Sequence, residues 1–315
     1  MDLSKWRLYT HNGCLDGCAS AILGMHAGID PKNIHYLNPG HVDEDLAESP
    51  AFLDPSKPIL LVDIAPYSDE MANRLAYRGR FVVLDHHKQS ERFAGRTGFI
   101  ISVGNKCCGA ELFREWLSQT AGCLEFDAPS FQRFTELVDD HDRWVHHHPF
   151  SQDMARFFAF VGQDTFIDDF YDIPERFGSS PALTPNGEHW WQPSERKLLG
   201  VVKAQQERRF KRLLERFTVR RRQFQGRDIA VAYIVTDEQN TSELLNDYLL
   251  GHPDIDLACQ VNLQSGKLSY RGVGRVSIPD LVVPLGGGGH FDAGGCSLPA
   301  GLEESVIEMV EGMEG

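Results

Sequence analysis

Acidic and imidazole side chains gather at a few places along this sequence, and each place ends or follows a short apolar run. The set comprises His11, Asp16, Asp63, Asp85-His86-His87 and Asp139-Asp140-His141-Asp142. Hard divalent metal ions such as Mn²⁺ and Mg²⁺ take carboxylate and imidazole ligands. A two-metal site needs a bridging carboxylate and several terminal ligands. A lone buried Asp or His could equally well cap a helix or accept a hydrogen bond. Four such groups at the ends of successive strands or helices instead indicate a metal centre.

The elements that must position these residues alternate between apolar runs and helical stretches. Residues 6–10, 59–62 and 81–84 have the composition of strands, and residues 20–27 and 69–77 have helical spacing. This alternation predicts an α/β fold with a doubly wound, mostly parallel sheet and helices on both faces. Ligands of such sheets bind beyond the carboxyl ends of the strands. The metal candidates stand at those ends.

The rest of the chain divides into a helical middle and a second α/β part. We expect helices at 108–119 and 129–144, and one long helix from Ser194 to Phe224 that contains the domain boundary. The aromatic-rich stretch 149–190 is expected to cap or support the site. The resulting prediction is a domain at 1–190, a helical connector at 191–225 and a smaller α/β domain at 226–315.

Several motifs in the first half resemble those of the DHH phosphoesterases. Val83-Leu84-Asp85-His86-His87 matches the signature of that family, and Thr10–Gly17 followed by Ala19–Ala21 is similar to its first motif. Leu61–Asp63 resembles the second motif, and Val138–Asp140 resembles the fourth.

A second group of motifs near the C-terminus resembles the DHH-associated domain. Gly286–His290 with Ala293–Gly295 is similar to its glycine-histidine motif, and Ser269–Arg271 matches the strand that precedes it. The resemblance therefore spans both ends of the chain and leaves about 145–225 uncovered.

The resemblance implies two divalent metal ions, Mn²⁺ above all, and hydrolysis of phosphoester or phosphoanhydride bonds. One metal would be held by His11 and Asp63. The other would be held by Asp16, Asp63, His86 and Asp140, with Asp63 as the bridge. Asp140 is favoured because it directly follows the Leu137-Val138 run, and Asp142 is the alternative. Asp85 would orient His86, and His87 would face the substrate phosphate as a donor.

Cys14 departs from the family pattern, since many members have an aspartate at this position. A thiolate is a softer ligand than a carboxylate and would favour Co²⁺, Zn²⁺ or Fe²⁺ over Mg²⁺. The other interpretation is that Cys14 does not bind metal and that the first metal site is weak or open.

The same resemblance implies that residues 226–315 bind the substrate. Backbone N–H groups of Gly287, Gly288 and Gly289 could approach a phosphate closely, since glycine has no Cβ and tolerates positive φ. Arg271 could pair with a phosphate through two hydrogen bonds, and His290 could bind a phosphate or a terminal hydroxyl. For the glycine run alone, a flexible loop is the other interpretation.

Composition limits the compartment and the partners. The chain has 315 residues, 42% of them hydrophobic, but no apolar run approaches the ~20 residues of a membrane helix. The first nine residues do not have the pattern of a secretory signal. Seven cysteines, an odd number, do not form a disulfide framework. We therefore expect a cytoplasmic protein without a membrane partner, in which an exposed connector helix would allow a homodimer.

The formal net charge of −14 argues against a stable complex with long nucleic acid. A small anionic substrate still needs local positive charge, which metal ions would supply. We predict a phosphodiesterase that hydrolyses short oligonucleotides or small cyclic nucleotides, with water activated by two metals. The alternatives are an exopolyphosphatase and a non-catalytic nucleotide-binding protein on the same fold.

Residues 207–223 run against the overall charge, with eight basic and two acidic residues. A solvated face of the connector helix is the simpler interpretation of this segment, and guidance of a polyanion is the other.

Overall fold

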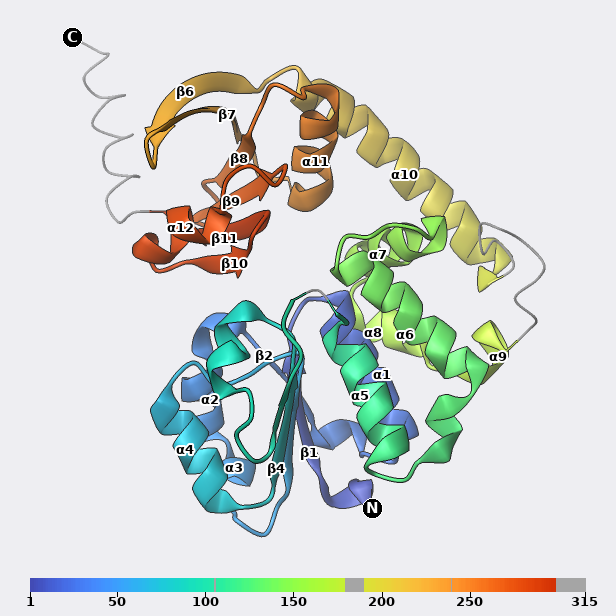
Figure 1. The fold of residues 1–315 in the computed structure, drawn as a ribbon. Coiled ribbons are helices and arrows are strands. Elements are labelled where there is room, and N and C mark those ends of the chain that lie inside the picture. Colours follow the sequence, from blue (N-terminus) through green and yellow to red (C-terminus); the bar gives the residue numbers. More distant parts are fainter. Residues whose placement is uncertain (105, 179–189, 239, 299–315) are drawn as a thin grey trace. The chain divides into compact units, whose positions relative to one another are not determined.

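The computed structural model describes residues 1–104, 106–178, 190–238 and 240–298, with the side chains of Ala51 and His290 left aside. These residues form two compact units (Figure 1). The N-terminal unit is Met1–Lys203 and the C-terminal unit is Ala204–Gly315, and the division falls inside helix α10 (Pro193–Leu214).

Five strands form the sheet of the N-terminal unit, in the order β2-β1-β3-β4-β5, and all pairs are parallel. They are β1 Arg7–His11, β2 Ile34–Leu37, β3 Ile59–Val62, β4 Phe81–Asp85 and β5 Phe99–Ile101. In the register, Thr10 lies opposite Val62, and Val62 lies opposite Leu84. The strands β1, β3 and β4 therefore end at one edge, and the predicted α/β class is confirmed.

Helices cover both faces of this sheet. Successive side chains of a strand point to opposite faces, and both sets are apolar here, so each face packs against helices. Leu60 packs with helices α1 (Leu15–His26), α5 (Gly109–Gln119) and α6 (Pro129–Asp142). Leu61, the next residue, packs with α2 (Val42–Glu48), α3 (Pro50–Leu53) and α4 (Asp69–Arg78). The polypeptide leaves β1 towards the first face and β3 towards the second. This reversal between neighbouring strands is the switch point at which open parallel sheets bind ligands.

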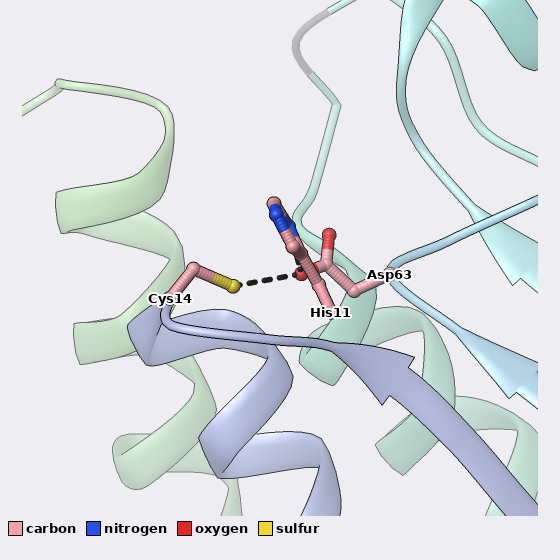
Figure 2. Close-up of side chains that lie close together, drawn as sticks. All are labelled: His11, Cys14 and Asp63. Atoms are coloured by element: carbon pink, nitrogen blue, oxygen red, sulfur yellow. Dashed lines mark hydrogen bonds and ion pairs between the residues drawn. The ribbon is translucent and has the colours of Figure 1, made fainter. Parts of the chain in front are cut away.

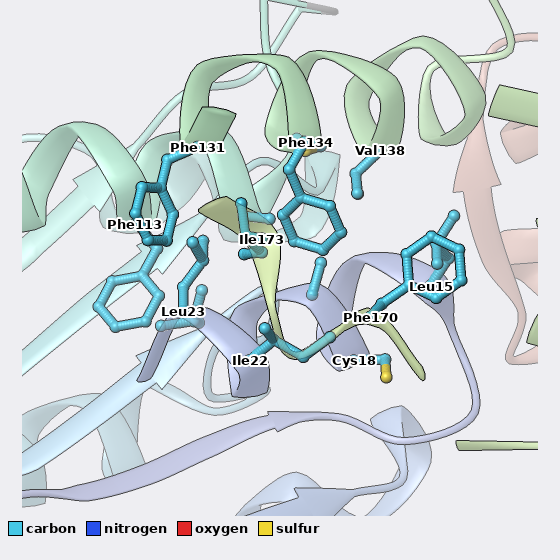
Figure 3. Packing of buried hydrophobic residues seen from close by; sticks show 14 of the residues in the cluster. Leu15, Cys18, Ile22, Leu23, Phe113, Phe131, Phe134, Val138, Phe170 and Ile173 are labelled. Atoms are coloured by element: carbon cyan, nitrogen blue, oxygen red, sulfur yellow. The ribbon is translucent and has the colours of Figure 1, made fainter. Parts of the chain in front are cut away.

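The aromatic-rich stretch after α6 adds to the first of these cores. It forms α7 (Pro149–Val161), α8 (Gln163–Phe170) and α9 (Ile173–Phe177). Phe170 and Ile173 are fully buried among side chains of α1 and α6, such as Ile22 and Phe134 (Figure 3). This segment therefore supports the helices whose ends carry the candidate ligands.

The C-terminal unit is built on a six-stranded sheet in the order β10-β11-β9-β8-β7-β6. Its strands are β6 Thr218–Phe224, β7 Arg227–Val235, β8 Leu257–Asn262, β9 Lys267–Gly272, β10 Gly288–His290 and β11 Ala293–Ser297. Only the β7–β8 pair is parallel. Helices α10 and α11 (Thr241–Gly251) pack on one face, and α12 (Ile278–Val282) packs on the other.

The expected helix from Ser194 to Phe224 is wrong in its last third. Helix α10 ends at Leu214, and residues 218–224 form strand β6, which pairs with β7 along its whole length. The buried stripe of the helix stops with Leu213, and Arg220 and Arg221 occupy the positions where the next helical turn after Phe217 would need apolar residues.

The seven cysteines all lie in the described part of the chain and are free thiols. Of the helices described, none has both the length and the apolar character that a bilayer crossing would demand.

Candidate metal centre

The candidate ligands converge at the switch point of the parallel sheet. His11 is the last residue of β1, and Asp63 directly follows β3. Asp85 is the last residue of β4, and His86 and His87 continue from it. Figure 2 shows His11, Cys14 and Asp63 turned toward one another from the ends of β1 and β3 and the loop before α1.

Asp63 lies at the middle of this group. One carboxylate oxygen is 3.4 Å from His11 Nδ1 and accepts a 3.1 Å hydrogen bond from Cys14 Sγ. The other oxygen is 3.2 Å from His86 Nε2. Burial acts to raise the pKa of Asp63, but the hydrogen bonds from His11 and His86 outweigh it and hold the pKa well below its usual range. Asp63 is therefore a fixed negative charge that faces ligands on two sides, as a bridging carboxylate must.

The backbone at Asp63 is unusual, with φ at +60°. This left-handed conformation is uncommon for a residue with a side chain and marks functional sites. Gly109, the first residue of α5, makes it possible, since a Cβ there would lie 2.6 Å from the Asp63 Cβ. The helix can therefore approach the strand end only because residue 109 is a glycine.

The start of α1 supplies two more candidates. Cys14 is the N-cap residue of the helix, and its sulfur accepts a 3.1 Å hydrogen bond from Gly17 N. Burial, together with the charges of Asp63 and Asp16, raises the pKa of the Cys14 thiol well above its usual value. A thiol held neutral by anionic neighbours would ionise readily beside a divalent cation. Cys14 thus caps a helix and faces Asp63 at the same time.

Asp16 lies in the first turn of α1 and is 1% exposed. Its carboxylate accepts hydrogen bonds of 2.7 and 2.6 Å from Gly109 N and Ala110 N, the first amides of α5. Burial and the charges of Asp63 and Asp142 nevertheless raise its pKa well above the usual range. The crowding of the buried Asp16 and Asp63 with the more exposed Asp142 therefore favours a bound positive charge at this site.

His86 connects three carboxylates through one atom. Its Nε2 lies 3.2 Å from Asp63, 3.6 Å from Asp16 and 3.5 Å from Asp142. Burial acts to lower the pKa of His86, but the hydrogen bond to Asp63 and the charge of Asp142 outweigh it and raise the pKa to about 9.

Asp85 bonds to His87, whereas the sequence interpretation had it orient His86. Its Oδ1 lies 2.8 Å from His87 Nδ1, and its Oδ2 accepts a hydrogen bond from Ser90 Oγ. Burial acts to lower the pKa of His87, but the charge of Asp85 and the hydrogen bond raise it to about 9. Asp85 therefore fixes the ring of His87, whose side chain is 23% exposed at the rim of the site.

The structure brings Asp142, rather than Asp140, to the cluster. Asp140 turns away and accepts hydrogen bonds from His147 N at 2.8 Å, from His148 N at 3.1 Å and from Ser151 Oγ. It anchors the loop that leads into α7. Helical geometry explains the difference, since residues two apart lie about 200° apart around the axis. We therefore propose Asp142 as the ligand from α6.

The two carboxylates can be told apart by isosteric substitution. Asp142→Asn is expected to lower kcat/KM by at least about 100-fold, because it removes a charged ligand. Asp140→Asn is expected to retain most activity and to lower the free energy of unfolding by about 1–2 kcal/mol, because its backbone partners lose a charged acceptor. Steady-state kinetics and urea unfolding of both variants measure this. The reverse pattern would restore Asp140 as the ligand.

Three overlapping trios of donor atoms could hold metal ions. They are His11-Cys14-Asp63, Asp63-His86-His87 and Asp16-His86-Asp142. The donor set combines carboxylates, imidazoles and one thiol, which suits first-row divalent metals. Repulsion among Asp16, Asp63 and Asp142 would be relieved by a bound cation. The residues present therefore fit a metal centre, and Asp63 and His86, each shared by two trios, would be its central ligands.

In the C-terminal unit, Arg271 and His290 occupy one row of the sheet. Arg271 pairs with Ala293, which pairs with His290, so the three residues lie side by side on β9, β11 and β10. Arg271 is held by Tyr270 O at 2.7 Å and by Ser242 Oγ of α11. Burial lowers the pKa of its guanidinium to about 10. The side chain of His290 lies outside the described part of the structure.

The glycines of this unit have partly structural roles. A Cβ at Gly287 would lie 2.2 Å from the carbonyl oxygen of Gly295, and a Cβ at Gly289 would lie 2.2 Å from that of Ala293. Both of these residues belong to β11, so the β10–β11 hairpin requires glycine at 287 and 289. Gly288 faces open space. Packing therefore explains why residues 287 and 289 are glycines, but it does not explain why residue 288 is one.

Sequence reasoning named Asp139 and Asp16 as candidates but missed the hydrogen bonds by which they lock the site together. Asp139 accepts a 2.7 Å hydrogen bond from Cys108 N and a 2.8 Å bond from Arg143 Nε, which ties α6 to the start of α5. With Asp16 on the next two amides, the N–H groups of the N-cap residue Cys108 and of the first two residues of α5 all bind carboxylates of other helices. Acidic groups at a helix N-terminus are a known preference, but partners so distant in sequence leave no local signal.

Comparison with known proteins supports the predicted resemblance to the DHH-type phosphoesterases. The chain is 24% identical over 316 residues to Oligoribonuclease NrnB of Bacillus subtilis (strain 168), with 96% of this chain and 75% of that protein covered. The pGpG-specific phosphodiesterase PggH from Vibrio cholerae shares the fold, with a TM-score of 0.52, 15% identity and 97% of each chain covered. No protein-family model matches the sequence.

Proposed function

We propose that this protein is a metal-dependent phosphodiesterase that hydrolyses short oligonucleotides or small cyclic nucleotides. The observation that carries the proposal is the convergence of His11, Asp16, Asp63, His86 and Asp142 on one strand edge, with Asp63 and His86 each shared by two donor trios. The similarity to an oligoribonuclease over 96% of the chain supports the substrate class. The N-terminal unit would hold the metals, and the C-terminal unit would hold the substrate.

Two divalent metal ions, proposed as Mn²⁺, would supply an activated water and neutralise charge on the phosphoryl oxygens. Asp63 would bridge them, with His11 and Cys14 on one side and Asp16, His86 and Asp142 on the other. His87 would donate a hydrogen bond to the phosphoryl oxygens, its ring held by Asp85. Arg271 would bind a second phosphate, since a guanidinium offers parallel donors to two phosphate oxygens.

The experiment that tests the function is a substrate panel with the full chain and Mn²⁺. It compares a linear dinucleotide, a short RNA, cyclic dinucleotides, cyclic AMP and polyphosphate. We expect the nucleotide phosphodiesters to be hydrolysed much faster than polyphosphate. Preference for polyphosphate would instead establish an exopolyphosphatase. No turnover with Mn²⁺, Co²⁺ or Mg²⁺ would leave a nucleotide-binding protein as the function.

Cys14 is expected to set the metal preference. Cys14→Asp replaces a soft ligand with a hard one, so activity with Mn²⁺ or Mg²⁺ should rise relative to activity with Co²⁺ or Zn²⁺ by about tenfold. Activity is measured after the metal-free protein is reconstituted with each ion. Cys14→Ser is the matched control, since it keeps an N-cap acceptor for Gly17 N without a strong ligand. An unchanged metal ranking in both variants would show that Cys14 only caps the helix.

The free thiols support a reducing compartment, and we propose the cytoplasm. The homodimer stays a prediction.

A further inference from the structure

Strand β6 presents a row of arginines on one face of the C-terminal sheet. It is the last strand in the sheet order, and six of its seven residues are exposed. Phe224 packs on the cluster formed by Ile229, Val231 and Cys259. Because side chains alternate along a strand, Arg220 and Arg222 lie on the same face as Phe224, and Arg221 lies on the other.

The two faces differ in how their charges are paired. Arg221 lies 2.9 Å from Asp228 and forms an ion pair. Within the described ranges, no carboxylate pairs with Arg220 or Arg222. Arg220 donates a hydrogen bond to the carbonyl oxygen of Val219, and Arg222 donates one to the hydroxyl group of Tyr233. This face therefore offers cationic donors that the described protein leaves without counter-charge.

A half-buried tyrosine, Tyr233 of β7, lies next to these arginines. It packs against the same cluster as Phe224 and lies opposite Thr218 of β6, so it shares the face of Arg220 and Arg222. Tyr270 lies on this face too, but on β9, three strands away from β6. Burial raises the pKa of Tyr233, while Arg222 acts to lower it, as expected for a guanidinium close to the phenol. At its exposed β6 edge, this face offers guanidinium groups beside an aromatic ring. Such an arrangement is suited to single-stranded nucleic acid, whose phosphates bind guanidinium groups and whose bases stack on aromatic rings.

Edge protection alone does not account for the pattern. Charged side chains on an edge strand discourage pairing with other strands, and one or two charges of either sign would serve. The chain has a net charge of −14, yet residues 207–223 hold eight basic and two acidic residues. Within this segment, the seven residues of β6 hold three arginines and no acidic residue. Positive charge is therefore concentrated on this strand against the overall composition, which favours local binding of a polyanion.

We propose that the β6 face with Arg220 and Arg222 binds the backbone of a single-stranded oligonucleotide, with Tyr233 as a stacking surface for a base. The inference rests on the proposed function, because it takes short oligonucleotides as the substrate class. It adds a binding surface for such oligonucleotides on the C-terminal unit.

The test measures binding without turnover. A fluorescein-labelled RNA hexamer is titrated with the full chain in EDTA, and Kd is read from anisotropy at several salt concentrations. Arg220→Glu/Arg222→Glu is expected to raise Kd by about tenfold or more, because attraction becomes repulsion. The slope of log Kd against log salt should fall by about 1.4, the value for two lost contacts to a single strand.

Arg221→Glu is the matched control, since it changes the same charge on the opposite face of the same strand. We expect its Kd to stay within about twofold of that of the unmodified protein. Equal binding by the double variant and the unmodified protein, or equal weakening by Arg221→Glu, would overturn the proposal. If the double variant fails to fold by circular dichroism, Arg220→Gln/Arg222→Gln takes its place. Failure of the proposed function would appear in the substrate panel and leave this result unaffected.

Discussion

His86→Ala is expected to lower kcat for a nucleotide phosphodiester by about 10³-fold. The imidazole Nε2 lies within 3.6 Å of Asp16, Asp63 and Asp142, and His86, like Asp63, belongs to two of the three trios. Its removal withdraws a ligand and leaves three carboxylates without the group that compensates their charge. Activity is measured with bis-p-nitrophenyl phosphate and a linear dinucleotide, each with Mn²⁺ or Co²⁺.

A second measurement separates loss of the centre from loss of the fold. Metal content after dialysis should fall in the His86→Ala variant, while its circular dichroism spectrum is preserved. His252→Ala is the matched control, because that imidazole lies at the end of α11 and stacks on Tyr248. The control is expected to keep its metal and its kcat. Full activity in the His86→Ala variant would remove this residue from the centre.

Gly109→Ala is expected to damage both stability and activity. The added methyl group would lie 2.6 Å from the Asp63 Cβ and 2.8 Å from its Cα, distances that real Cβ contacts do not reach. Either α5 or the end of β3 must move, which should lower the free energy of unfolding by about 2–3 kcal/mol. Activity should fall with it, because Asp63 and the α5 amides that hold Asp16 both shift. Urea unfolding and kcat/KM of the folded variant measure the two effects.

Gly200→Ala provides the comparison for this substitution. Gly200 lies in α10, and a Cβ there would meet nothing within 4 Å. The same chemical change should therefore raise the free energy of unfolding by about 0.5–1 kcal/mol, through the lower entropy of the unfolded chain. Equal stability losses at both positions would show that the contact with Asp63 is not the cause.

The sequence was sufficient for the ends of the strands and for the class of chemistry. Short apolar runs closed by His11, Asp63 and Asp85 predict a parallel sheet with ligands at its carboxyl edge, because strand length and residue type are local properties. The sequence analysis expected Asp85 to orient His86, and the structure places it against His87. Sequence could not decide between them because the direction of each side chain beyond a strand end depends on loop dihedrals. Ser90, four residues downstream of His86, helps to fix Asp85 and carries no motif.

The choice between Asp140 and Asp142 was within reach of helical geometry. Val138 is fully buried and lies four residues before Asp142, so both occupy the same side of α6. Asp140 was favoured because it directly follows the apolar run Leu137-Val138. That rule finds the residue at the end of a strand, but it does not show which side of a helix a residue occupies. Strand β6 was missed for a different reason. An exposed edge strand with six solvent-facing residues has no apolar alternation, and its basic composition suits a solvated helix equally well.

The carboxylates that bind the first amides of α5 have a consequence for how the centre opens. Asp139 holds the amide of Cys108, and Asp16 holds those of Gly109 and Ala110. These protons can exchange with solvent only when α1, α5 and α6 separate, and those helices share one buried core. Amide exchange at 108–110 should therefore report the slowest, global opening of this unit. The candidate metal ligands would therefore come together and separate in the same cooperative step in which this core folds and unfolds.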